Sequence, residues 1–233
     1  MRESFLAQRS RFRRIAARFA GPPSLWCYII GKLALDPAYD TVREHLRGSS
    51  CPIVDVGCGL GLLAHYLRDY GCRAPFIGCD LDARKIALAT AAARRGRLTG
   101  VSFRCADAAD VFCGPADVVL LDVLHYLDMD RQAELLTRLA AHVASGDGRV
   151  IIRTTPRERS WRYGATVLEE YWTRLSRWIP VGGAINFPSR ETVLAPFLAA
   201  GCRCDVRPLW GCTPFNSHLF VFAPAHAGAL TPA

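Results

Sequence analysis

The stretch Val54-Asp55-Val56-Gly57-Cys58-Gly59-Leu60-Gly61-Leu62-Leu63 decides the fold of this chain. An apolar run over 53–56 precedes three alternating glycines, and apolar residues at helical spacing follow them. This order predicts a strand, a tight turn and a helix. Glycine lets a backbone turn sharply and approach a ligand closely, and the start of a helix presents unpaired N–H groups. The stretch therefore predicts a loop that holds a nucleotide-like molecule.

The spacing of the glycines separates two kinds of nucleotide site. A dinucleotide fingerprint needs glycine at the first, third and sixth positions, but the sixth position here is Leu62 and the third glycine is already at position 61. The pattern Asp-Val-Gly-Cys-Gly-Leu-Gly resembles motif I of the class I S-adenosylmethionine-dependent methyltransferases. In that family the loop packs against the methionine and ribose part of the cofactor. The resemblance implies that the cofactor contacts Asp55, Gly57, Cys58, Gly59 and Gly61.

Strand-like and helix-like segments alternate after this loop. Such alternation implies βαβ units and a parallel sheet, whose carboxyl edge is where these folds bind ligands. We predict an α/β, Rossmann-like fold with a mostly parallel seven-stranded sheet, and the resembled family implies an antiparallel last strand. The expected strands are 51–56, 75–80, 101–105, 117–121, 148–153, 202–207 and 218–223, and the expected helices among them are 60–70, 82–95, 130–144, 165–178 and 189–200.

The ends of the chain differ from this core. Residues 1–48 are predicted to form an N-terminal helical cap, 49–224 the Rossmann-like domain with a lid insertion at 156–188, and 225–233 a frayed tail. Ser24 is expected to cap the second helix of the cap.

Residues 1–20 form a basic amphipathic helix in this interpretation, with Phe5, Phe12 and Phe19 recurring every seven residues among the arginines at 9, 11, 13, 14 and 18. It is expected to lie on the domain as part of a lid. A peripheral membrane contact is the alternative.

Composition restricts the class of protein. The net charge of +8 comes almost entirely from arginine, because lysine occurs only twice; this usage suggests a GC-rich bacterial genome. No apolar run is long enough to span a membrane, and no signal peptide is recognisable. Ten cysteines occur without a C-x-x-C spacing, so we expect reduced, packed thiols in a cytoplasmic protein. Cys51, Cys79, Cys105, Cys202 and Cys204 are expected in or beside core strands.

Two acidic strand ends complete the predicted cofactor site. Asp80 ends the second strand, one βα unit after the glycine loop, where a carboxylate can accept both ribose hydroxyls; Asp82 is the better candidate for a helix cap. Leu81 would flank the adenine. Asp107 and Ala108 follow the third strand and resemble the family's motif II, which implies contacts to the adenine, and Asp110 is the competing acidic residue.

The segment after the fourth strand is where the resembled family brings cofactor and substrate together. Asp122, His125 and Tyr126 occupy it here, with Asp122 expected on the cofactor. His125 can take a proton from a hydroxyl as the methyl group arrives, because the pKa of an imidazole lies near working pH. The alternative is that His125 only packs or hydrogen-bonds near the cofactor. No metal-ligating cluster appears at the strand ends, so no metal is predicted.

Two further stretches narrow the resemblance. The segments 28–37 and 209–216 look like those of stand-alone methyltransferases from bacterial aryl-polyene and related pigment pathways, which belong to secondary metabolism. The resemblance implies transfer of a methyl group to a small phenolic or acyl-linked acceptor, most simply to an oxygen atom. Tyr28, Tyr126, Trp161 and Trp172 are the candidate acceptor-binding residues; the aromatic residues over 161–187 are alternatively the core of the insertion.

Two alternatives belong to other classes of protein. One is a NAD-linked oxidoreductase, which Leu62 disfavours, and the other is a non-catalytic protein that binds S-adenosylmethionine or assists assembly. Nucleic acid is a disfavoured partner, because no Asn/Asp-Pro-Pro-Tyr motif follows the fourth strand. The sequence leaves the oligomeric state open.

Overall fold

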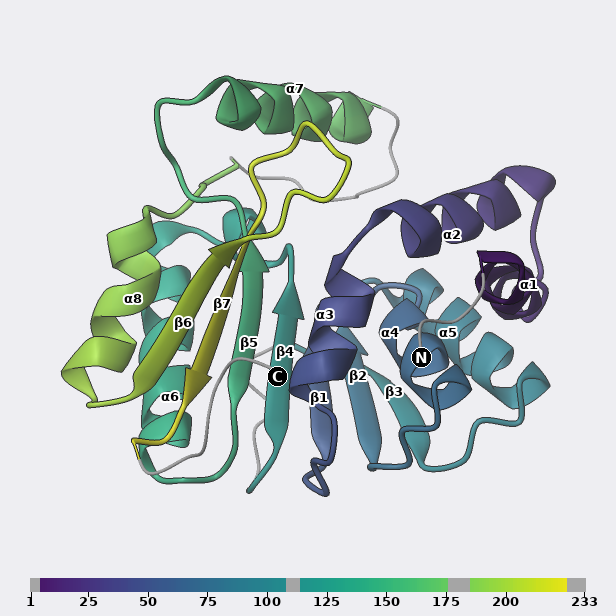
Figure 1. The fold of residues 1–233 in the computed structure, drawn as a ribbon, viewed down its shortest axis with the longest axis horizontal. Helices are drawn as coiled ribbons and strands as arrows, with labels where there is room; N and C mark the ends of the chain where they lie inside the picture. The colour runs from purple at the N-terminus through teal and green to yellow at the C-terminus, as the bar shows by residue number, and fades with distance from the viewer. Residues whose placement is uncertain (1–4, 108–113, 176–184, 226–233) are drawn as a thin grey trace. The chain divides into compact units, whose positions relative to one another are not determined.

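A computed structural model describes residues 5–107, 114–175 and 185–225. The chain forms two compact units, Met1–Val111 and Phe112–Ala233. Figure 1 labels the helices and strands of both units.

The first unit carries the N-terminal helices and three parallel strands. Strand β2 pairs in parallel with β1 on one side and with β3 on the other, so that Phe76 lies opposite both Ile53 and Val101. Helices α4 and α5 connect the strands. The elements are α1 (Phe5–Ala16), α2 (Pro23–Leu35), α3 (Ala38–His45), β1 (Ile53–Val56), α4 (Leu62–Asp69), β2 (Phe76–Asp80), α5 (Ala83–Arg95) and β3 (Val101–Cys105).

The second unit contains the antiparallel strand. Strands β4 and β5 pair in parallel, whereas β7 runs antiparallel to both β5 and β6. Helix α7 lies beyond the carboxyl ends of β4 and β5 (Figure 1). The elements are β4 (Asp117–Leu121), the short 3-10 helix η2 (Leu124–Tyr126), α6 (Met129–Ala144), β5 (Val150–Thr154), α7 (Trp161–Leu175), α8 (Arg190–Ala199), β6 (Arg203–Pro208) and β7 (His218–Ala223).

The predicted fold class is confirmed. The strands make a seven-stranded, mostly parallel sheet, with β3-β2-β1 from the first unit and β4-β5-β7-β6 from the second. Every residue of β1, β5 and β7 is buried, as expected for strands covered on both faces. In the second unit, Phe197 of α8 stacks on Phe222 of β7 with ring centroids 3.6 Å apart.

Some local expectations were wrong. Ser24 does not cap α2, which begins at Pro23 after Pro22; a proline at the first helical position is itself favourable. Helix α6 begins at Met129, one residue before the predicted start, and is capped by Asp128. Of the cysteines expected in the core, Cys79 and Cys202 are buried, but Cys105 is exposed because the edge strand β3 is only half covered.

The arginines of the α1 segment are used largely within the first unit. Phe12 and Phe19 are buried, and Arg11 lies 4.2 Å from the centroid of the Tyr70 ring. Arg18 pairs with Asp69 at 2.5 Å. The basic face of α1 therefore fastens this helix to α4. Over the described ranges, no helix combines the length and apolar character needed to cross a bilayer.

Candidate functional site

The glycine loop links β1 to α4 and turns through three left-handed residues. Gly57, Gly59 and Gly61 have φ values of +71°, +54° and +70°, a region that glycine adopts without strain. A Cβ added to Gly61 would lie 2.5 Å from the ring of Phe103, whereas one added to Gly59 would meet nothing within 4 Å. Gly61 is thus needed for packing, and Gly59 borders open space where a ligand can approach the backbone.

Asp80 joins the end of β2 to this loop. Its Oδ2 accepts the N–H of Gly59 at 2.9 Å, and its Oδ1 accepts the N–H of Asp82 at 2.8 Å. Each carboxylate oxygen has a further lone pair, so the carboxylate can still accept hydroxyl groups. Asp82 caps α5, accepting the N–H groups of Arg84 and Lys85, as expected.

Asp55 and Cys58 are held in their neutral forms. Burial, reinforced by the charge of Asp80, raises the pKa of Asp55 to about 8. Burial, with Asp55 as the next cause, raises the pKa of the Cys58 thiol. Because the thiolate is the reactive form of cysteine, Cys58 serves packing in the loop.

The ends of β2 and β3 lie together in the first unit. Ala106 donates its N–H to the Asp80 carbonyl at 3.3 Å, so half-buried Asp107 follows directly. Leu81, which is 67% exposed, offers an apolar side chain beside this edge. Ala108 and Asp110 lie outside the described residues.

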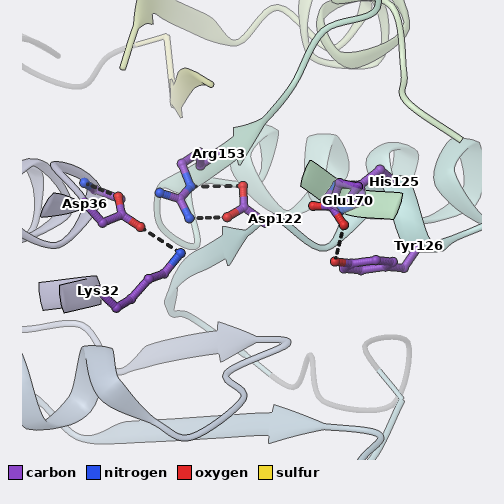
Figure 2. A network of polar contacts seen from close by, with 8 residues as sticks. Lys32, Asp36, Asp122, His125, Tyr126, Arg153 and Glu170 are labelled. Atoms are coloured by element: carbon purple, nitrogen blue, oxygen red, sulfur yellow. Dashed lines mark hydrogen bonds and ion pairs between the residues drawn. The ribbon is translucent and has the colours of Figure 1, made fainter. Parts of the chain in front are cut away.

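Asp122, in the second unit, follows β4 in a left-handed conformation, with φ of +59°. Its carboxylate is paired with Arg153 of β5 through two contacts, one of them Nε to Oδ1 at 3.0 Å (Figure 2). Sequence reasoning missed Arg153. The sequence could have indicated it, because Arg153 interrupts the apolar strand 150–154 and a buried charge needs a partner.

His125 lies in a buried polar cluster with Glu170 of α7. Its Nε2 is 3.3 Å from Glu170 Oε1, an ion-pair distance without hydrogen-bond geometry, since among the described residues neither ring nitrogen has a hydrogen-bond partner. Tyr126 donates its hydroxyl proton to Glu170 Oε2 at 2.9 Å (Figure 2). Phe187 stacks on the His125 ring, with centroids 5.1 Å apart. Burial, and next the charge of Glu170, raises the pKa of Tyr126, so the phenol remains a donor.

Sequence reasoning also missed Glu170, although α7 carries a readable signal. Arg162, Thr166 and Glu170 recur every four residues and so share one helix face. Arg162 donates to the carbonyl of Thr213 at 2.7 Å, and the Thr166 hydroxyl accepts the N–H of Asn216 at 2.9 Å. The polar stripe of α7 is therefore the face that packs inward.

The candidate acceptor-binding aromatics lie in different environments. On α7, Trp161 is 68% and Trp172 is 66% exposed. On α2, Tyr28 is 43% exposed, and its neighbour Lys32 pairs with Asp36 at 2.9 Å (Figure 2). Within the second unit, Tyr126 is joined through Glu170 to the cluster that contains His125.

Comparisons with known proteins give one family match. Residues 53–146 match the family model described as a methyltransferase domain. No curated protein sequence matches the chain.

Solved structures of low identity share the fold. Magnesium protoporphyrin IX methyltransferase from Synechocystis PCC 6803 with bound SAH is 21% identical, with a TM-score of 0.63, over 92% of this chain and 93% of that one. An O-methyltransferase family protein from Burkholderia thailandensis is 20% identical, with a TM-score of 0.64, over 92% of this chain and 63% of that one. The pyocyanin biosynthetic protein PhzM is 17% identical, with a TM-score of 0.61, over 94% and 63%.

Proposed function

We propose that this chain is a class I S-adenosylmethionine-dependent methyltransferase that methylates an oxygen atom of a small phenolic or acyl-linked acceptor, with His125 as the general base. The proposal depends most on one observation, the buried His125–Glu170 contact at 3.3 Å. A buried imidazole beside a carboxylate is oriented and can be stabilised when it takes up a proton.

The residues of the first unit fit the adenosine part of the cofactor. Open space borders Gly59, and Asp80 retains acceptor capacity for the ribose hydroxyls. Leu81 can cover an adenine ring, and Asp107 can accept the amino group of the adenine. Asp55, Gly57, Cys58 and Gly61 shape the loop, and we assign Asp122 and Ala108 to the cofactor on the resemblance alone.

Glu170 faces Nε2 of the imidazole at 3.3 Å. If Nε2 carries the proton and faces Glu170, the lone pair of Nδ1, which is buried and has no hydrogen-bond partner among the described residues, can accept the proton of an acceptor hydroxyl that enters the cluster. The bound cofactor supplies a methyl group already activated on a sulfonium. When the methyl group passes to the acceptor oxygen, His125 would take the hydroxyl proton, and Glu170 would stabilise the resulting imidazolium. Tyr126 holds Glu170 in place through its hydroxyl.

Exposed aromatic side chains support an apolar acceptor. Trp161 and Trp172 present planar apolar side chains on α7, suited to an aromatic or polyene group. In the first unit, Tyr28 of α2 stays a candidate acceptor-binding residue on the sequence alone. The pyocyanin and O-methyltransferase names among the structural neighbours support a role in secondary metabolism. The packing of α1 favours its interpretation as part of the cap over the membrane contact, and nine free cysteines among the described residues support a cytoplasmic location.

Calorimetry with S-adenosylhomocysteine tests the cofactor assignment. Asp80→Ala is expected to weaken binding about 10- to 100-fold, as for a lost hydrogen bond to a charged group. Asp82→Ala is the matched control, because it removes a nearby carboxylate that caps α5. It is expected to leave affinity within about 2-fold and to cost about 1 kcal/mol of stability. Equal effects of the two changes would remove Asp80 from the ribose site.

Turnover to S-adenosylhomocysteine with a panel of phenols and acyl-phenols tests the reaction. His125→Gln is expected to lower kcat by about 10²- to 10⁴-fold, the usual contribution of a general base. Glu170→Gln should lower it less, and Glu169→Gln, which alters the preceding glutamate on α7, should leave it unchanged. Retained turnover in His125→Gln would contradict the role of His125 as general base. Methylation of amines in place of phenols would contradict the proposed oxygen acceptor.

A further inference from the structure

Asp122 has an unusual backbone conformation at a point where the chain leaves the sheet. It is one of two non-glycine residues with positive φ in the described part of the chain. Such a conformation costs on the order of 1–3 kcal/mol and persists only where neighbouring groups hold it. Aspartate adopts positive φ more readily than most residues do, but less readily than glycine.

One residue holds Asp122 at both its main chain and its side chain. The N–H of Asp122 donates to the carbonyl of Arg153 at 3.0 Å, which continues the β4–β5 pairing one residue beyond Leu121. The guanidinium of the same arginine donates to both carboxylate oxygens. Its side chain is 6% exposed and that of Asp122 32%. A bidentate pair of this kind is among the strongest and most directional of side-chain contacts.

The held turn leads directly into the segment that carries His125. Only Val123 separates Asp122 from η2. Within that segment, Tyr126 donates its N–H to the carbonyl of Val123 at 3.0 Å, and the His125 carbonyl accepts the N–H of Asn186 at 2.9 Å. Because so few rotatable bonds intervene, a change in φ at Asp122 displaces the His125 ring relative to Glu170.

We infer that Arg153 is a positioning residue: by clamping Asp122 in its left-handed conformation, it places His125 against Glu170. Its action is conformational, through the backbone of Asp122. The inference deepens the proposed function, on which it rests for the importance of His125. Its test observes the imidazole directly and needs no acceptor.

The test is nitrogen NMR of the histidine rings in the full-length protein, with the His125 signals identified by their loss in His125→Gln. Arg153→Gln is expected to shift both His125 ring signals by several line widths, and Arg153→Lys should shift them too, because an ammonium cannot reproduce the bidentate contact. Arg190→Gln, an exposed arginine at the start of α8, is the control of matched chemistry and should leave them in place.

Rescue by glycine separates a conformational role from a purely electrostatic one. Glycine adopts φ of +59° without strain, so Asp122→Gly combined with Arg153→Gln should return the His125 signals to near their original positions. Failure of this rescue, with the double variant folded by thermal melting, would overturn the inference. So would unshifted signals in Arg153→Gln. Turnover assays with His125→Gln address the proposed function independently of either result.

Discussion

Helices α1 and α7 are both amphipathic, but they bury opposite faces. In the first unit, α1 buries Phe12 and Ile15, and its segment's arginines reach α4. In the second unit, α7 buries Thr166 and Glu170 and exposes Trp161, Leu168 and Trp172. The comparison shows that an apolar stripe in the sequence identifies the hydrophobic face of a helix. It does not by itself predict that this face is buried within the same chain.

The physical reason lies in the partners of the polar groups. Burying a polar group is costly unless it is hydrogen-bonded. On α7 each member of the inward stripe has a partner, in the carbonyl of Thr213, the N–H of Asn216 and the hydroxyl of Tyr126. The orientation of α7 is therefore specified by polar contacts. As far as the described residues show, Trp161, Leu168 and Trp172 on its apolar face stay mostly exposed, which agrees with the proposed acceptor contacts on α7.

The largest expected difference in unfolding free energy is between two aromatic-to-alanine substitutions, one on each helix. Phe12→Ala should reduce the free energy of unfolding by about 3–5 kcal/mol, because it opens a cavity among buried side chains. Trp172→Ala should change it by less than about 0.5 kcal/mol, since the side chain is mostly exposed. Urea unfolding of the two variants measures both. Similar losses would contradict the opposite burial of the two helices.

Acid should weaken the packing of the α1 segment, because His65 contacts Arg18 at 3.2 Å and the ring of Phe19 at 5.1 Å. Burial, followed by the charge of Arg18, lowers the pKa of His65 to about 3, so the folded chain binds fewer protons than the unfolded chain between about pH 6.5 and 3. Stability from His65 is lost as pH falls through that window, by about 1.4 kcal/mol per pH unit. His65→Gln should flatten the slope of unfolding free energy against pH there. An unchanged slope would show that His65 titrates normally.

Asp55, in the same unit, should give stability the opposite pH dependence to that of His65. Its pKa is raised to about 8, so the folded chain binds more protons than the unfolded chain between about pH 4 and 8. Stability from Asp55 is lost as pH rises through this window, and Asp55→Asn should remove that loss. Urea midpoints at pH 6 and pH 8 measure it. A larger loss at pH 8 in the variant than in the parent protein would refute the raised pKa.

A smaller effect tests the polar stripe of α7. Arg162→Met should cost about 1–3 kcal/mol, because it leaves the Thr213 carbonyl without its donor and removes the guanidinium that lies 4.7 Å from Trp161 and 4.5 Å from Trp210. Arg13→Met, on the exposed face of α1, is the matched control. Thermal melting compares the two, and an equal shift in Tm would show that α7 is not held by its polar side.

The smallest effect concerns the exposed arginines of α1. Arg13→Gln together with Arg14→Gln should change stability by less than about 0.5 kcal/mol. If α1 serves only as part of the cap, the parent protein and this variant will cosediment equally little with anionic vesicles. Salt-sensitive binding of the parent protein, lost in the variant, would favour the membrane contact instead.

The order of elements could be read from the sequence because it depends on local patterns. Strands at 101–105, 117–121 and 218–223 have the predicted bounds, since their apolar runs end at turn residues. The glycine loop and Asp80 were recognisable because each stands at a fixed distance from a strand end. Helix α7 begins four residues earlier than predicted, at Trp161; Ser160 accepts the N–H of Tyr163 there.

The sequence by itself determined the βα alternation, the turn through three glycines and the carboxylates at the ends of β2 and β3, because all depend on neighbours in the chain. Only the tertiary structure decided that Glu170 meets Tyr126, 44 residues away, that Arg153 clamps Asp122, and that α7 packs by its polar face. These contacts depend on which strands pair and on which buried polar groups find partners. Local periodicity does not encode either.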